Sequence, residues 1–95
     1  MPLPDKDERY RRAEDFLGAC IAVWDAWEDD AVVLDRERGV WADRGKIHQP
    51  HYQGEYHSVR DALALPRSPQ GRPVIAQAGQ SPEGRRLAAR HADVV

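Results

Sequence analysis

The residues best suited to chemistry lie between Val74 and Arg85, where an apolar run gives way to glycine, serine and a helical pattern. This order predicts a strand that turns at Gly79 and enters a helix capped by Ser81. The turn would gather several backbone N–H groups, with the positive end of the helix dipole behind them. Such donors favour phosphate or another anion, but many α/β proteins contain the same turn without a ligand. The lysine of a P-loop and the spacing of a dinucleotide fingerprint are both absent.

Tyr10 is the second candidate for a ligand contact. It starts the apolar stripe of the first predicted helix, so its hydroxyl could reach past the helix end. A core tyrosine is the competing interpretation, and the local sequence does not decide between them. Ser81 has no histidine partner at a recognisable spacing, so no catalytic residue is predicted.

Three histidines, His48, His51 and His57, raise the question of a metal site. They lie in a polar stretch with proline, glycine and no cysteine, so solvated loop histidines are the simpler interpretation. Cys20 is the single cysteine, which excludes an internal disulfide framework. It falls on the apolar face of the first helix, where we expect a buried, unreactive thiol.

These candidates must be positioned by two helices. The first is expected from about Asp7 to about Trp27, preceded by a capping-box-like pair, Asp5 and Glu8. Its apolar stripe repeats at steps of three and four residues: Tyr10, Ala13, Phe16 or Leu17, Cys20 or Ile21, Trp24 and Trp27. The acids at 28–30 oppose the helix dipole and should end the helix.

The middle of the chain predicts little regular structure. Residues 31–34 and 38–41 suggest a weak hairpin, and residues 55–60 suggest another short extended piece. The proline-rich segment 66–73 cannot be helical. An insertion of this length is more often a functional or docking segment than part of a core.

The last third predicts a strand at 74–77, a helix at about 82–91 and the start of another strand. Helix, strand, helix and strand in this order are typical of a parallel α/β sheet or barrel. The expected division is therefore a helix over 1–30, an insertion and connector over 31–72, and a βα unit over 73–95. This pattern looks like one section of a larger α/β protein.

Composition limits the classes of partner. The 95 residues are 41% apolar and 32% charged, which is typical of a soluble globular chain with one small domain at most. A net charge of −2 gives no general attraction to nucleic acid or to an anionic membrane. No run reaches the roughly 20 apolar residues that span a bilayer, and the charged start does not resemble a signal peptide. We therefore expect a cytoplasmic protein.

Several segments read together match a known pattern: ERYR at 8–11, WDAWEDD at 24–30, GEY at 54–56, LPRSPQGRP at 65–73, QAGQS at 77–81 with Gly84, and AAR at 88–90 with Ala92 and Asp93. They resemble the nitrilotriacetate monooxygenase branch of the bacterial-luciferase-like flavin monooxygenases. Members act on aminopolycarboxylates, sulfones of fused thiophenes, dimethyl sulfide and long-chain alkanes. Residues 60–63 depart from the arginine-glycine-proline-leucine run that relatives often carry, so the insertion is expected to pack differently.

The resemblance implies a partial (β/α)8 TIM barrel, of which this chain would be the middle section: helix, irregular insertion, strand, helix and the start of the next strand. It also implies FMN as cofactor, reduced by a separate flavin reductase, and a small organic substrate. By position, Ser81 and the backbone of Gly79 and Gln80 would hold the FMN phosphate. Tyr10, with Arg9 as a further candidate, would contact it from the first helix.

The resemblance thus predicts a fragment of an FMNH2-dependent monooxygenase, an oxidoreductase that uses O2. We expect the chain to be inactive alone, because the flavin-ring contacts and the substrate pocket would lie outside it. Two alternatives remain open. One is a small non-enzymatic α/β module that binds an anion or a partner, stabilised as a homo-oligomer through Trp24 and Trp27. The other is a gene remnant.

Overall fold

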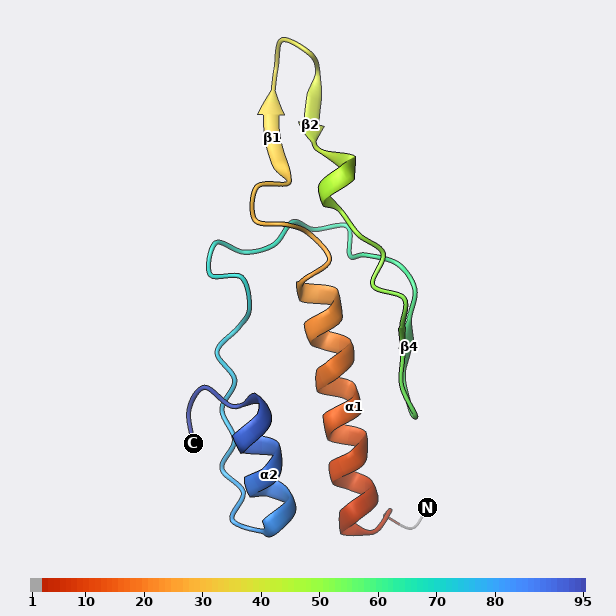
Figure 1. Ribbon diagram of the computed structural model, residues 1–95, viewed down its shortest axis with the longest axis vertical. Coiled ribbons are helices and arrows are strands. Elements are labelled where there is room, and N and C mark those ends of the chain that lie inside the picture. Colours follow the sequence, from red (N-terminus) through yellow and green to blue (C-terminus); the bar gives the residue numbers. More distant parts are fainter. Residues whose placement is uncertain (1–2) are drawn as a thin grey trace.

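The computed structural model describes residues 3–95, and Met1 and Pro2 of the expected first segment lie outside the described residues. The elements follow in this order: α1 (Lys6–Trp24), β1 (Val32–Asp35), β2 (Val40–Ala42), the 3₁₀ turn η1 (Arg44–Lys46), β3 (Tyr52–Gln53), β4 (Ser58–Val59) and α2 (Pro82–His91). Helix α1 lies along the longest axis of the molecule in the lower half of the view, with α2 on one side and the β3–β4 hairpin on the other (Figure 1). The β1–β2 hairpin extends beyond the C-terminal end of α1.

Helix α1 begins where the sequence predicts and ends three residues early. The Asp5 carboxylate accepts a hydrogen bond from the Glu8 N–H at 2.8 Å, which confirms the predicted cap. The helix stops at Trp24, and the chain then turns so that Trp27 leaves the helical stripe. The Trp27 side chain is buried, and its indole N–H donates to the Leu63 carbonyl at 3.0 Å. The helix therefore ends early because the Trp27 ring is buried from the loop that follows α1, and a helix continued to Trp27 would not place the ring there.

The apolar stripe predicted on α1 is only partly correct. Leu17, Cys20 and Ile21 are half-buried, so the expected full burial of the cysteine is wrong. Ala13 and Phe16 are exposed, Phe16 to 58%. Among the helices and strands of the described residues, α2, β3 and β4 contact α1.

The predicted weak hairpin is present as β1 and β2, which pair antiparallel with an irregularity in register. A small core forms where this hairpin meets the end of α1. Its buried members are Ala26, Trp27 and Ala31. The Trp41 ring meets the Trp27 ring edge-on at 5.7 Å between centroids, so aromatic packing fixes the hairpin to this core.

A carboxylate on α1 holds the β3–β4 hairpin. Asp15 accepts hydrogen bonds from the Tyr52 hydroxyl at 2.6 Å and from the N–H groups of Tyr56 at 2.9 Å and His57 at 2.7 Å. A Cβ at Gly54 would overlap the Asp15 carboxylate, so glycine is required for this approach. The Tyr52 hydroxyl is the main cause that lowers the pKa of Asp15 below its usual value.

The predicted strand at 74–77 is wrong as a regular strand. The segment is extended, but it forms a single parallel bridge, between Ala76 and Val94. The Gln77 N–H donates to the Val94 carbonyl at 3.1 Å. A parallel ladder needs neighbouring strands, and in residues 3–95 only the segment after α2 pairs with this one.

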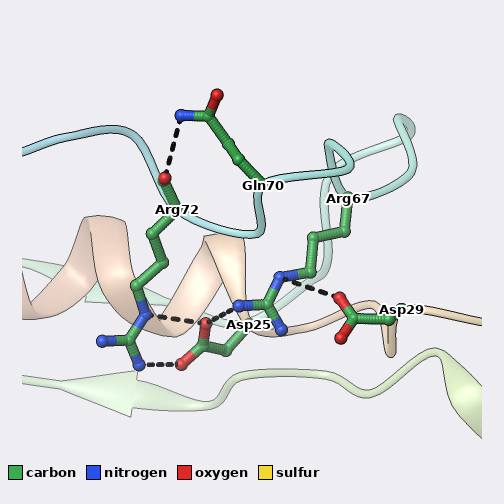
Figure 2. A network of polar contacts seen from close by, with 5 residues as sticks. All are labelled: Asp25, Asp29, Arg67, Gln70 and Arg72. Carbon is green, nitrogen blue, oxygen red and sulfur yellow. Dashed lines mark hydrogen bonds and ion pairs between the residues drawn. The ribbon is translucent and has the colours of Figure 1, made fainter.

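Segment 66–73 is free of helix, as predicted, and it is anchored on the end of α1 (Figure 2). Asp25 is the C-cap of α1, and both of its carboxylate oxygens accept hydrogen bonds from the Arg72 guanidinium. Arg72 Nε lies 3.0 Å from Oδ1. Arg67 Nη2 lies 3.1 Å from the same Oδ1, and Arg67 Nε lies 3.6 Å from Asp29. Gln70 donates to the Arg72 carbonyl at 3.0 Å and closes the turn. We call the group of Asp25, Arg67 and Arg72 the arginine clamp.

Candidate anion site at the start of helix α2

The predicted turn and capped helix are present. Ser81 is the N-cap of α2, and its Oγ accepts a hydrogen bond from the Gly84 N–H at 3.1 Å. Pro82 takes the first helical position, where its missing N–H costs nothing. The helix over 82–91 has the predicted bounds. The segment thus folds locally as its capping residues dictate.

The backbone donors of the turn remain available for a ligand. Within residues 3–95, the N–H groups of Gly79, Gln80 and Ser81 make no hydrogen bond to a protein acceptor. The helix itself uses the next donors, because Gly84 donates to the Ser81 side chain and Arg85 donates to the Ser81 carbonyl at 2.9 Å. The donors open to an anion are therefore those of the turn, not those of the first helical turn.

Tyr10 lies at this turn although 71 residues separate it from Ser81. Its hydroxyl oxygen is 3.4 Å from Ser81 Oγ. The structure thus brings together all four residues for which an FMN contact was predicted: Tyr10, Gly79, Gln80 and Ser81. Their role toward an FMN phosphate stays a prediction. Arg9, the further candidate, is exposed on α1.

Two glycines permit this close approach. A Cβ at Gly79 would lie 3.0 Å from the Tyr10 hydroxyl, and one at Gly84 would lie 2.9 Å from it. The Gly84 Cβ would also lie 3.2 Å from the Gly79 Cα. Turn, helix and tyrosine can therefore meet only because neither position carries a side chain. Gly84 was not predicted to take part in this close approach. The sequence signal for it is the pair of glycines on either side of Ser81, at 79 and 84.

The charge beside the turn is mixed. Glu83 occupies the second position of α2, and its carboxylate lies 3.8 Å from Lys6 Nζ. A hydrogen bond from its own backbone N–H is the main cause that lowers the pKa of this carboxyl. An open groove between α1 and α2 adjoins Tyr10, and residues 79–81 do not line it. The charged residues of the groove are Asp5, Asp7, Arg11, Glu14, Glu83, Arg86 and Arg90.

The histidines lie apart from this turn. His48 Nε2 is 2.7 Å from a Glu28 carboxylate oxygen, and the His57 ring meets the Phe16 ring edge-on. In the part of the chain that the structure describes, no group of three or more histidine, cysteine or acidic side chains is arranged to hold a metal ion. Across residues 3–95, moreover, no helix combines the length and the apolar character needed to traverse a bilayer.

Comparison with protein families gives a match over residues 2–95, to the model described as luciferase-like monooxygenase. Dibenzothiophene-sulfone monooxygenase of Rhodococcus erythropolis is 50% identical over 91 residues, which are 96% of this chain and 20% of that protein. Nitrilotriacetate monooxygenase component A of Aminobacter aminovorans is 47% identical over 88 residues, which are 93% of this chain and 19% of that protein.

Solved structures with a similar fold include enzymes that this chain also covers only in part. A long-chain alkane monooxygenase superposes with a TM-score of 0.92 at 40% identity, over 99% of this chain and 22% of that one. A riboflavin lyase solved with modified FMN and riboflavin superposes with a TM-score of 0.89 at 36% identity, over 99% and 21%. The chain thus spans about a fifth of the length of the curated relatives it matches.

Proposed function

Because the chain belongs to the luciferase-like monooxygenase family, we propose that it contributes part of the FMN phosphate site of a flavin-dependent monooxygenase barrel. One observation carries this proposal: the unpaired N–H groups of Gly79, Gln80 and Ser81 lie beside the hydroxyls of Ser81 and Tyr10. Tyr10 from α1 and Ser81 from the turn before α2 thus bring hydrogen-bond donors close together, as an anion site requires.

The chemistry of these groups suits a phosphate monoester. A phosphate needs several donors around its oxygens, and the three amides supply them at fixed positions. Each hydroxyl can rotate its proton toward an oxygen. Gly79 has no side chain to block the approach. The residues present therefore fit the terminal phosphate of FMN.

The role of this chain is to bind and orient. When bound, the reduced flavin supplies the oxygen chemistry of the family. Gly79, Gln80, Ser81 and Tyr10 would fix one end of the cofactor, and we assign no catalytic residue to this chain. We further propose that the cofactor arrives from a separate flavin reductase in the cytoplasm. A small organic molecule would be the substrate, as the names of the sulfone and nitrilotriacetate monooxygenases suggest for the relatives.

The 95-residue chain alone should not oxygenate a substrate. It spans about a fifth of its curated relatives, and the remaining parts would have to supply the flavin-ring and substrate contacts. FMN-dependent oxygenation by the purified chain would contradict this part of the proposal.

The phosphate site is tested by nuclear magnetic resonance on the ¹⁵N-labelled chain, titrated with FMN and separately with riboflavin, which lacks the phosphate. We expect FMN to shift the amide signals of Gly79, Gln80 and Ser81 at an affinity of about 1 mM, since most cofactor contacts are missing. Riboflavin should leave these signals in place. Equal shifts with both compounds, or FMN shifts confined to other residues, would overturn the assignment.

A further inference from the structure

We infer that Glu14 is a positioning residue, which keeps the Tyr10 hydroxyl at the turn before α2 by fixing α1 against α2. This inference rests on the proposed function, in which Tyr10 contacts the FMN phosphate. Glu14 lies one helical turn after Tyr10 on the same face of α1. Its carboxylate forms an ion pair with Arg90 near the end of α2, and His91 Nε2 lies 3.6 Å from the same carboxylate oxygen.

The Tyr10 hydroxyl is not held firmly by its own hydrogen bond. Its distance of 3.4 Å from Ser81 Oγ is long for a bond between two hydroxyls, which is usually about 2.7–2.8 Å. The hydroxyl also lies close to two glycines, because a Cβ at Gly79 would be 3.0 Å from it and a Cβ at Gly84 would be 2.9 Å from it. A small displacement of α1 against α2 would therefore take the hydroxyl out of reach of Ser81 or press it against the turn.

Two ion-pair contacts join the helices on either side of Tyr10. Lys6 Nζ lies 3.8 Å from Glu83 at the start of both helices, and Glu14 meets Arg90 near the end of α2. The contacts are eight residues apart on α1 and seven apart on α2, which is about 12 Å and about 10.5 Å along the two axes. The helices run in the same direction (Figure 1), so this matched spacing fixes their relative position. Glu14 is the stronger contact, because it has two basic partners, whereas Lys6 is half-exposed at the first residue of α1.

The negative charge of Glu14 allows positioning to be separated from electrostatics. A carboxylate near the site repels a phosphate dianion, so a purely electrostatic role predicts that loss of the charge strengthens FMN binding. Loss of the ion pair with Arg90 frees α2 to shift against α1, so a positioning role predicts that FMN binding weakens. The two roles thus predict effects of opposite sign.

The first test is Glu14→Gln in the FMN titration followed at the amides of Gly79, Gln80 and Ser81. We expect about two- to threefold weaker FMN binding, in line with the modest contribution of a partly exposed ion pair. Glu37→Gln makes the same change of net charge in the exposed turn between β1 and β2, so it should leave the affinity unchanged. Unchanged or tighter FMN binding in Glu14→Gln would overturn the inference.

Tyr10→Phe shows whether Glu14 acts through the tyrosine hydroxyl. This variant should itself weaken FMN binding about fivefold, because the ring can no longer donate a hydrogen bond to a phosphate oxygen. If Glu14 positions that hydroxyl, adding Glu14→Gln to Tyr10→Phe should cause no further loss. The same two- to threefold loss in both backgrounds would contradict the inference, since a general loss of stability does not depend on the hydroxyl.

A measurement without ligand distinguishes this inference from the proposed function. In the unchanged chain we expect nuclear Overhauser contacts between the Tyr10 ring and the α-protons of Gly79 and Gly84. These contacts should weaken in Glu14→Gln and persist in Glu37→Gln. Weakened contacts without FMN binding at the turn in any variant would overturn the phosphate site and leave the positioning of Tyr10 standing. Contacts that persist in Glu14→Gln would overturn the role of Glu14, whatever the affinity for FMN.

Discussion

Asp15 shows how much one residue can organise in so short a chain. Its carboxylate accepts three hydrogen bonds from a hairpin about 40 residues away in sequence, and Gly54 leaves the space that this contact needs. Nothing near Asp15 in the sequence signals this role. The partners are distant along the chain, and an exposed helical aspartate has the same local pattern.

The titration of Asp15 follows from these contacts. Because its pKa in the folded chain is lowered, its stabilising effect is complete above the usual aspartate pKa of about 3.9 and is lost as the pH falls through the folded pKa. We expect the amide signals of Tyr56 and His57 to shift together with a midpoint below that value. The measurement is a pH titration followed by nuclear magnetic resonance.

Asp15→Asn is the matched variant for this titration. It should remove the shared transition and detach the β3–β4 hairpin at neutral pH as well, because one carboxylate oxygen becomes an N–H₂ donor. A midpoint at or above the ordinary aspartate value in the unchanged chain would contradict the structure.

Other residues could be assigned from sequence because their signals are local. Ser81, Pro82 and the glycines on either side specify a capped turn without reference to the rest of the molecule. Tyr10 is an intermediate case. Its place near the helix end allowed a ligand contact, but only the packing of α1 against α2 shows which turn it meets.

At the scale of elements, the arginine clamp explains why a proline-rich segment without helix or strand has a defined path. Two guanidinium groups share the Asp25 carboxylate, and Gly71 adopts a positive φ of 84° beside Arg67. Arg72 is the main cause that lowers the pKa of Asp25. The clamp thus couples the end of α1 to the start of the extended segment 74–77.

Removing the shared carboxylate should release this segment. In Asp25→Ala we expect amide hydrogen exchange in residues 67–75 to rise about tenfold, the effect of losing roughly 1.4 kcal/mol of local stability. Exchange in the first turns of α1 should not change. Hydrogen exchange read by mass spectrometry or nuclear magnetic resonance makes this measurement.

Asp29→Ala is the control for the clamp. Asp29 is 81% exposed and touches Arg67 only at 3.6 Å, so its loss should have little effect on exchange. Equal effects of the two variants would show that general charge, not the shared carboxylate, orders the segment.

Predictions of elements succeeded where the signal was local and failed where it depended on neighbours. The cap of α1, the β1–β2 hairpin and the bounds of α2 are confirmed. The strand at 74–77 and the last turn of α1 were wrong. A strand depends on its partners, and Trp27 is buried by contacts with Leu63 and Trp41 that its helical spacing could not reveal.

At the scale of the whole molecule, the predicted fold class is confirmed: the chain is a partial (β/α)8 barrel of the luciferase-like type. The predicted resemblance to the nitrilotriacetate monooxygenase branch is likewise confirmed. Composition and periodicity indicated only an α/β protein. The barrel followed from specific sequence segments spread over nearly the whole chain, because no single element of it is distinctive.

The stability of the 95-residue chain should reflect its sparse interior. Few apolar residues are fully buried, and large apolar side chains such as Leu65, at 72%, and Val74, at 68%, are exposed. We expect a broad thermal transition by far-UV circular dichroism, with a midpoint that sub-millimolar FMN does not raise, since ligand below its Kd adds little stability. A sharp transition would favour the alternative of an autonomous, non-enzymatic module. A midpoint raised by FMN would show a phosphate site that works alone.

Helix α1 contacts two distant parts of this chain, because Tyr10 meets the turn before α2 near the start of the helix and Asp25 holds the arginine clamp at its end. The helical stretch between Tyr10 and Asp25 therefore fixes both the distance and the relative rotation of these two contacts. One inserted residue would rotate one end against the other by about 100° and lengthen the helix by about 1.5 Å. A chain that keeps both contacts must therefore keep the number of residues between Tyr10 and Asp25, whereas the helical residues before Tyr10 are not constrained in this way.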